Sequence, residues 1–215
     1  MKVLVIGGGG REHAIVDALA RSAQVEKIWC APGNAGIAAQ AECVAIKETE
    51  VERLRDFAAA NEIGLTVVGP EVALAAGLVD AFKAAGLRIF GPTKAAARIE
   101  SSKEFAKDLM AKYAIPTAGY RAFTEYAEAL DYVASRPLPA VLKYDGLAAG
   151  KGVVIAETQE EADAALKDML LDDKFGEGKV VVEDFLTGPE FSFMCFVSGR
   201  KVWPMALAQD HKRAF

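Results

Sequence analysis

The segment KYDGLAAGKG, which begins at Lys143, combines two lysines with three glycines. Lysine ammonium groups balance phosphate charge, and glycines let backbone N–H groups approach phosphate oxygens. The segment does not fit a Walker A loop, because three residues instead of four separate Gly146 from Gly150, and Gly152 follows Lys151 where Ser or Thr would bind magnesium. We therefore interpret it as a flexible glycine flap over a triphosphate, joining two antiparallel strands. A solvated surface hairpin is the alternative for the loop taken alone.

A second glycine-rich segment, GGGGREH, begins at Gly7 between an apolar run and a helical pattern. Its backbone N–H groups and the following helix N-terminus predict an anion site. A dinucleotide fingerprint would need a third glycine at Glu12 and an acid near residues 29–33, and the sequence has neither. The segment therefore predicts a site for an anion other than NAD, with a tight turn that binds nothing as the alternative.

An acidic and aromatic turn follows the apolar run at residues 180–182. Glu183, Phe185 and Leu186 lie in the turn, and Glu190 comes four residues later. A purine needs an apolar slot with polar groups at its edge, and ribose hydroxyls favour a carboxylate. Beside the lysine strand and the glycine flap, this turn predicts the adenosine part of a nucleotide site.

The elements that must position these segments fall into two groups. Up to about residue 100, β-branched runs alternate with helical patterns, which predicts βαβ units and a parallel sheet with helices on both faces. Ligands bind at the carboxyl ends of such strands, where the glycine-rich turns cluster. The expected strands are 3–6, 28–31, 43–46, 65–68 and 88–90, and the expected helices are 13–22, 50–61 and 75–85.

The remaining residues predict a compact α+β lobe and the start of another. A helix over 102–113 leads into strands at 120–123, 140–143, 153–156 and 180–184, with helices at 126–134 and 160–171. A hairpin then pairs 191–197 with 202–208 around residues 198–200.

Bulk composition limits the function classes. The chain has 215 residues, 52% of them hydrophobic and 26% charged, which is typical of a globular protein. A net charge of −5 argues against nucleic-acid binding. Three separated cysteines and two histidines supply no zinc ligand set. The first apolar run is too short for a signal peptide and no run approaches a membrane span, so we expect a cytoplasmic location and no membrane partner.

Several longer motifs resemble the phosphoribosylamine–glycine ligase family of the ATP-grasp superfamily. They are GGGGREHA at 7–14, APGNAG at 31–36, VVGPEVALAAG at 67–77, FGPTKAAARIESSKEFAK at 90–107, KYDGLAAGKGVV at 143–154 and QDHKR at 209–213. The resemblance implies an α/β fold: a Rossmann-like, phosphoribosylamine-binding domain over 1–100 and a truncated ATP-grasp domain over 101–215. Within the second domain, a central flap lobe would span about 119–186, and 187–215 would begin the core lobe.

The resemblance also implies a reaction. ATP would phosphorylate glycine to a glycyl phosphate, and the amine of 5-phosphoribosylamine would attack it to give glycinamide ribonucleotide, ADP and phosphate. Mg²⁺, or Mn²⁺ in its place, would assist. The family's metal ligands are expected later in its sequence and none within this chain, so these 215 residues alone would be inactive.

Residue roles follow from the same resemblance. The catalytic set is Lys143, Lys212 and Arg213. The ATP-binding set is Lys103, Lys143, Gly146, Gly150, Lys151, Gly152, Glu183, Phe185, Leu186 and Glu190. The substrate-binding set is Gly9, Gly10, Arg11, Glu12, Asn34, Glu71 and Asp210. A dinucleotide-dependent oxidoreductase and a non-catalytic nucleotide-binding module are the alternatives, and the sequence does not indicate an oligomeric state.

Overall fold

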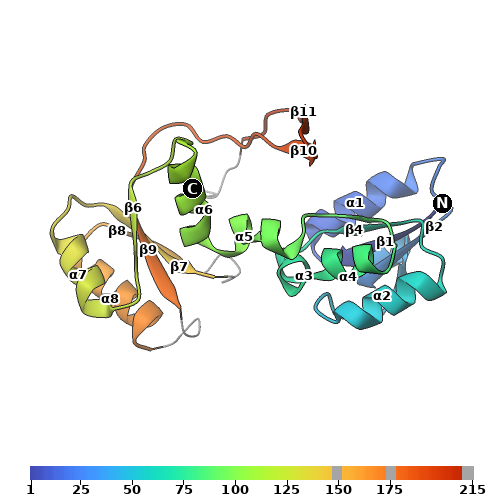
Figure 1. Cartoon of the computed structure of the whole chain (residues 1–215), viewed down its shortest axis with the longest axis horizontal. Coiled ribbons are helices and arrows are strands. Elements are labelled where there is room, and N and C mark those ends of the chain that lie inside the picture. Colours follow the sequence, from blue (N-terminus) through green and yellow to red (C-terminus); the bar gives the residue numbers. More distant parts are fainter. Residues whose placement is uncertain (147–151, 173–177, 210–215) are drawn as a thin grey trace.

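The structure is a computed structural model that describes residues 1–146, 152–172 and 178–209. Its first part is a five-stranded parallel sheet in the order β3-β2-β1-β4-β5 (Figure 1). The strands are β1 (Lys2–Gly7), β2 (Lys27–Pro32), β3 (Glu42–Cys43), β4 (Leu65–Val68) and β5 (Ile89–Phe90). Strand β1 is central, and its residues Val3, Leu4, Val5 and Ile6 are fully buried because helices cover both faces of the sheet.

The helices of this part divide between the two faces. Val16 of α1 (Gly10–Ala20) packs with Val3 and Val5, whereas Leu54 of α2 (Val51–Ala60) and Phe82 of α4 (Leu78–Ala84) pack with Leu4 and Ile6. The predicted parallel sheet with helices on both faces is therefore confirmed.

Three local predictions were wrong or incomplete. The helix expected at 75–85 is two helices, α3 (Glu71–Ala76) and α4, because Gly77 adopts a left-handed φ of 93° that ends the first. The strand expected at 43–46 is reduced to the two residues of β3. A further helix, α5 (Lys94–Ser101), begins where Thr93 Oγ1 accepts from Ala96 N, and a short 3₁₀ turn, η1, covers Ile37–Ala39.

The second part is a four-stranded antiparallel sheet in the order β6-β9-β7-β8. Its elements are β6 (Tyr120–Phe123), α7 (Tyr126–Ala134), β7 (Ala140–Asp145), β8 (Val153–Ala156), α8 (Gln159–Leu170) and β9 (Lys179–Asp184). Helices α7 and α8 pack on one face (Figure 1). Helix α6 (Lys103–Lys112), capped by Ser102, lies between the two parts and contacts β7.

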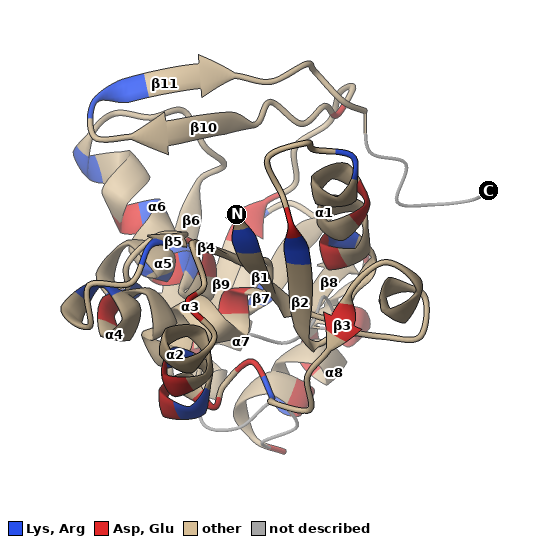
Figure 2. Cartoon of the chain, turned by 90° about the vertical axis from the view of Figure 1, so that its right-hand side faces the viewer, with Lys and Arg blue, Asp and Glu red and all other residues tan. Residues whose placement is uncertain are grey.

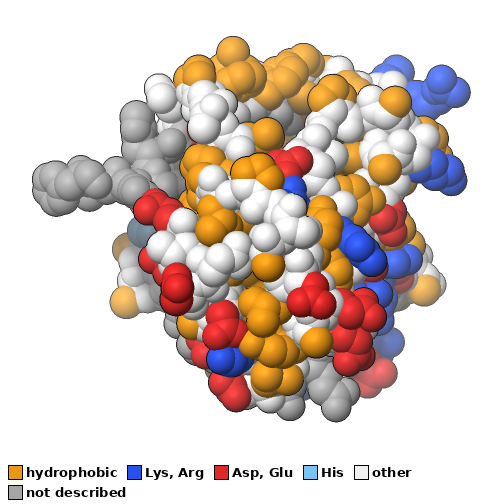
Figure 3. Space-filling view, turned by 90° about the vertical axis from the view of Figure 1, so that its left-hand side faces the viewer, with side chains coloured by type: hydrophobic (Ala, Val, Ile, Leu, Met, Phe, Trp, Pro, Cys, Tyr) orange, Lys and Arg blue, Asp and Glu red, His pale blue; other side chains and the backbone are white. Residues whose placement is uncertain are grey.

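The chain then forms the predicted hairpin, β10 (Cys195–Ser198) and β11 (Lys201–Pro204), extended by a bridge between Ser192 and Ala208. It lies above the rest of the molecule in Figure 2. Every residue of both strands is exposed, and Figure 3 shows hydrophobic side chains gathered along the same upper edge. The ring of Phe196 lies 5.8 Å from that of Phe90, which brings the hairpin against β5.

None of the helices in the described part of the chain has the length and apolarity that crossing a bilayer would require.

Candidate active site

One cavity lies at the end of β9, on the face of the second sheet opposite to α7 and α8. Val141 pairs with Glu183 across β7 and β9, and the alternation of β7 puts Lys143 on the same face as Val141. The cavity has a volume of about 510 Å³. Its lining includes five of the residues predicted for the nucleotide, namely Lys143, Glu183, Phe185, Leu186 and Glu190.

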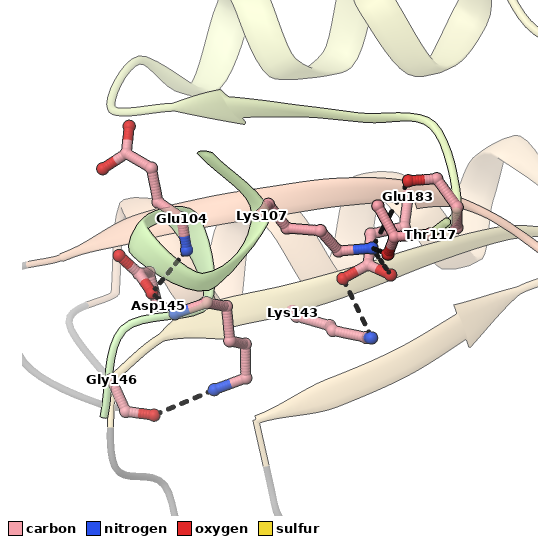
Figure 4. Close-up of polar contacts among 9 residues, drawn as sticks. Glu104, Lys107, Thr117, Lys143, Asp145, Gly146 and Glu183 are labelled. Carbon is pink, nitrogen blue, oxygen red and sulfur yellow. Dashed lines mark hydrogen bonds and ion pairs between the residues drawn. The ribbon is translucent and has the colours of Figure 1, made fainter. Parts of the chain in front are cut away.

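Glu183 occupies the floor of this site between two lysines (Figure 4). Its carboxylate is 2.8 Å from Lys107 Nζ and 2.9 Å from Lys143 Nζ, and its side chain is only 6% exposed. A buried carboxylate needs such partners, because an unpaired buried charge is costly. Both of its oxygens therefore have a lysine partner, and Lys143 reaches the cavity from beside it.

Sequence reasoning missed Lys107. It lies one helical turn after Lys103 on α6, and this i, i+4 spacing was the available signal. Its ammonium group also donates to Thr117 Oγ1 at 2.8 Å and to the Ala118 carbonyl at 3.4 Å, so three acceptors surround it.

Lys103, at the start of α6, lies beside the end of β7 and is not among the residues that line this cavity. Asp145, at the end of β7, accepts from the N–H groups of Lys103 and Glu104 and from Ser102 Oγ, so it caps α6. Lys103 Nζ donates to the Gly146 carbonyl at 3.0 Å. Burial lowers the pKa of Lys103, the nearby Asp145 opposes that shift, and the Lys143 charge adds to it.

The described ends of the flap have the predicted arrangement. Lys143 pairs with Val153 across the antiparallel strands β7 and β8, and Tyr144 N donates to the Gly152 carbonyl at 2.8 Å. Gly146 and Gly152 therefore flank the loop as expected. The other predicted residues Gly150, Lys151, Asp210, Lys212 and Arg213 lie outside the described residues.

A second cavity, of about 620 Å³, opens at the carboxyl ends of β1, β2 and β4. Of the predicted substrate residues, its lining includes Gly9, Gly10, Arg11, Glu12 and Glu71.

Three polar side chains shape its rim. Asn34 Nδ2 donates to the Gly8 carbonyl at 2.8 Å, and Arg11 Nη1 donates to the Gly69 carbonyl at 2.7 Å. Glu12 is only 5% exposed, and its Oε2 accepts from the N–H of Gly9 at 2.7 Å. Glu12 thus supports the loop from beneath, and the part in substrate binding that the family resemblance implies for it stays a prediction.

The described residues contain no group of three or more His, Cys, Asp or Glu side chains able to hold a metal ion.

Comparison with known proteins decides the family. Residues 1–100 match the family model described as the N domain of phosphoribosylglycinamide synthetase, and residues 101–215 match that of its ATP-grasp (A) domain. The chain belongs to the phosphoribosylglycinamide synthetase family. It is 57% identical to the phosphoribosylamine–glycine ligase of Listeria innocua across all of this chain and 52% of that protein. The chain thus spans about half the length of the curated family members it matches.

Solved structures agree with the family fold. The crystal structure of phosphoribosylamine–glycine ligase from Thermotoga maritima is 32% identical with a TM-score of 0.81, and the match covers 99% of this chain and 51% of that one. Carboxyaminoimidazole ribonucleotide synthase from Aspergillus clavatus, complexed with ATP, is 19% identical with a TM-score of 0.76, covering 99% of this chain and 54% of that one. The second likeness concerns the fold alone. The predicted fold class, a parallel α/β sheet followed by an ATP-grasp lobe, is confirmed.

Proposed function

We propose that this chain provides the phosphoribosylamine-binding domain and the first part of the ATP-binding domain of a phosphoribosylamine–glycine ligase. The protein would join glycine to 5-phosphoribosylamine at the expense of ATP. The observation that carries the proposal is the cavity in which Lys143, the apolar pair Phe185 and Leu186, and Glu190 meet beside the glycine flap, in a chain of this family.

The proposed chemistry has two steps. A glycine carboxylate oxygen takes the γ-phosphoryl group of ATP, and ADP leaves. The amine nitrogen of phosphoribosylamine then attacks the carbonyl carbon, phosphate leaves, and the nitrogen loses a proton. A carboxylate is a poor electrophile, and a closed site protects the acyl phosphate from water. The protein contributes mainly positioning and charge stabilisation.

The site residues take the following proposed roles. Lys143 and Lys103 face the phosphates, with the flap residues Gly146, Gly150, Lys151 and Gly152 above them. Phe185 and Leu186 lie against adenine and Glu190 against the ribose. Glu183 contributes its backbone to the adenine edge, because two lysines occupy its carboxylate.

The substrate side of the site rests on family likeness and on the second cavity. Gly9, Gly10, Arg11, Asn34 and Glu71 hold the phosphoribosyl group, and Glu12 acts on it through the loop. Asp210, Lys212 and Arg213 face the substrates. Mg²⁺ or Mn²⁺ would screen phosphate charge.

Calorimetric titration of this chain tests the nucleotide assignment. We expect saturable binding of ATP with Mg²⁺ and none of NAD⁺. Saturable NAD⁺ binding at micromolar concentration, with none for ATP, would contradict the proposal. The full-length protein tests the reaction. Phosphate release should require glycine and phosphoribosylamine together, and equal release when either substrate is omitted would exclude ligation.

A further inference from the structure

Lys107 is a lysine that the nucleotide cannot reach directly. Its side chain is only 9% exposed. Its three acceptors are Glu183 Oε2, Thr117 Oγ1 and the Ala118 carbonyl, which match the three N–H bonds of an ammonium group. Lys107 therefore has no donor left for a phosphate.

Lys143, by contrast, is 27% exposed and lines the cavity. Its ammonium group lies 2.9 Å from Glu183 Oε1. Glu183 has one negative charge to share between two lysines, so the three side chains together carry a net charge of +1. Without Lys107, a buried carboxylate and Lys143 would form a neutral pair.

We infer that Lys107 is a positioning residue for nucleotide binding: by neutralising Glu183, it leaves the charge of Lys143 available to the triphosphate. The inference rests on the proposed function, because it assumes that Lys143 faces the phosphates. Lys107 of α6 contacts both the carbonyl of Ala118, which lines the same cavity, and the carboxylate of Glu183 in β9.

The deciding experiment compares Lys107→Met with the double variant Lys107→Met/Glu183→Gln. Lys107→Met should weaken ATP binding at least about fivefold, because Lys143 then balances the whole negative charge of Glu183. The double variant removes the competing carboxylate as well, so its affinity should return to within about twofold of the original chain. Lys112→Met, at an exposed lysine of the same helix, is the matched control and should bind ATP normally.

A second measurement needs no nucleotide. The rate at which an N-hydroxysuccinimidyl acetate acylates Lys143, relative to exposed Lys201, is followed by peptide mass spectrometry. We expect it to fall at least about threefold in Lys107→Met, since the whole carboxylate charge of Glu183 then engages the Lys143 ammonium group, and to recover in the double variant. Thermal unfolding of each variant monitors the fold.

The outcomes separate the two proposals. If acylation follows this pattern but the original chain binds no ATP, the effect of Lys107 on the charge of Lys143 stands, whereas the nucleotide assignment fails and with it the part of Lys107 in nucleotide binding. The role of Lys107 is overturned if Lys107→Met matches the original chain in both ATP affinity and Lys143 acylation. It is also overturned if the double variant has the same low ATP affinity and acylation rate as Lys107→Met. Should Lys107→Met not fold, Lys107→Arg retains the charge and should retain ATP affinity within about threefold. A loss of ATP affinity larger than this in Lys107→Arg would also overturn the inference.

Discussion

Glu12 Oε2 accepts a 2.7 Å hydrogen bond from the backbone N–H of Gly9, so a side chain of α1 supports the glycine loop that precedes the helix. The carboxylate fits there because Gly69 has no side chain: a Cβ at that position would lie 1.9 Å from Glu12 Oε1. The shape of the second cavity thus depends on a glycine of a different loop.

Gly69→Ala should therefore destabilise the fold. Its methyl group would displace Glu12, and overpacking of this kind costs about 1–3 kcal/mol in the free energy of unfolding. Urea denaturation measures the loss. Gly10→Ala is the control, because a Cβ there meets nothing within 4 Å. Adding Glu12→Ala to Gly69→Ala should recover part of the lost free energy of unfolding. If Gly69→Ala were as stable as Gly10→Ala, the prediction would be wrong, because Glu12 would then move aside at no cost.

Gly9→Val should weaken binding of a phosphoribosyl ligand while leaving ATP affinity unchanged. Gly9 has φ −90° and ψ −173°, an extended backbone that valine also adopts. The new side chain would block the approach of an anion to the loop, and its Cβ would lie 3.0 Å from Glu12 Oε2 and press on the carboxylate that supports the loop. Titration with glycinamide ribonucleotide and, separately, with ATP measures both affinities. An equal loss of both would mean that Gly9 matters for folding.

Lys143→Met in the full-length protein should lower turnover at least about a hundredfold. Losing one charge-stabilising contact costs roughly 2.7–4 kcal/mol, and each 1.36 kcal/mol is about tenfold in rate. Steady-state phosphate release measures the effect beside Lys112→Met, which should match the unaltered enzyme. Turnover of Lys143→Met within about threefold of that enzyme would assign Lys143 a structural role.

The three thiols should differ in reactivity. Burial, with smaller contributions from Cys43 and Glu12, raises the pKa of Cys30 to about 12, whereas Cys43 and Cys195 are exposed. A raised pKa means less thiolate, roughly one molecule in ten thousand at pH 8. Iodoacetamide at pH 8 should label Cys43 and Cys195 in the native chain and reach Cys30 only after urea is added. Native labelling of Cys30 as fast as Cys43 would show that the first sheet opens readily.

The hairpin β10–β11 should make this chain associate. Val197 and Val202 pair across the strands, at 59% and 56% exposure, beside exposed Phe196 and Trp203. An apolar two-stranded ribbon with open edges tends to pair with other chains. Sedimentation velocity should reveal concentration-dependent oligomers that Val197→Lys/Val202→Lys reduces. A chain that stays monomeric at about 100 μM, well into the range where exposed edges aggregate, would contradict this expectation.

The spacing of apolar and polar residues along the sequence was sufficient to predict many of the helices and strands. Strands β4, β6 and β8 and helix α7 have the predicted bounds, because each combines a clear periodicity with Gly, Pro or polar residues at its ends. The same spacing did not predict the break at Gly77, whose left-handed φ divides one expected helix into two. The nucleotide turn was readable because Phe185, Leu186 and Glu190 are neighbours in sequence as well as around the cavity.

Tertiary structure alone decided which charges meet. Lys107, Lys143 and Glu183 come from α6, β7 and β9. They converge because the β7–β9 register pairs Glu183 with Val141, two residues before Lys143 on the same face, while α6 packs against β7. Glu12 likewise turns inward only because Gly69, on another loop, leaves room for it. The spacing of apolar residues along a sequence predicts helices and strands. The partner of a buried charge instead depends on the register of the sheet and on which element covers the charge and excludes water from it.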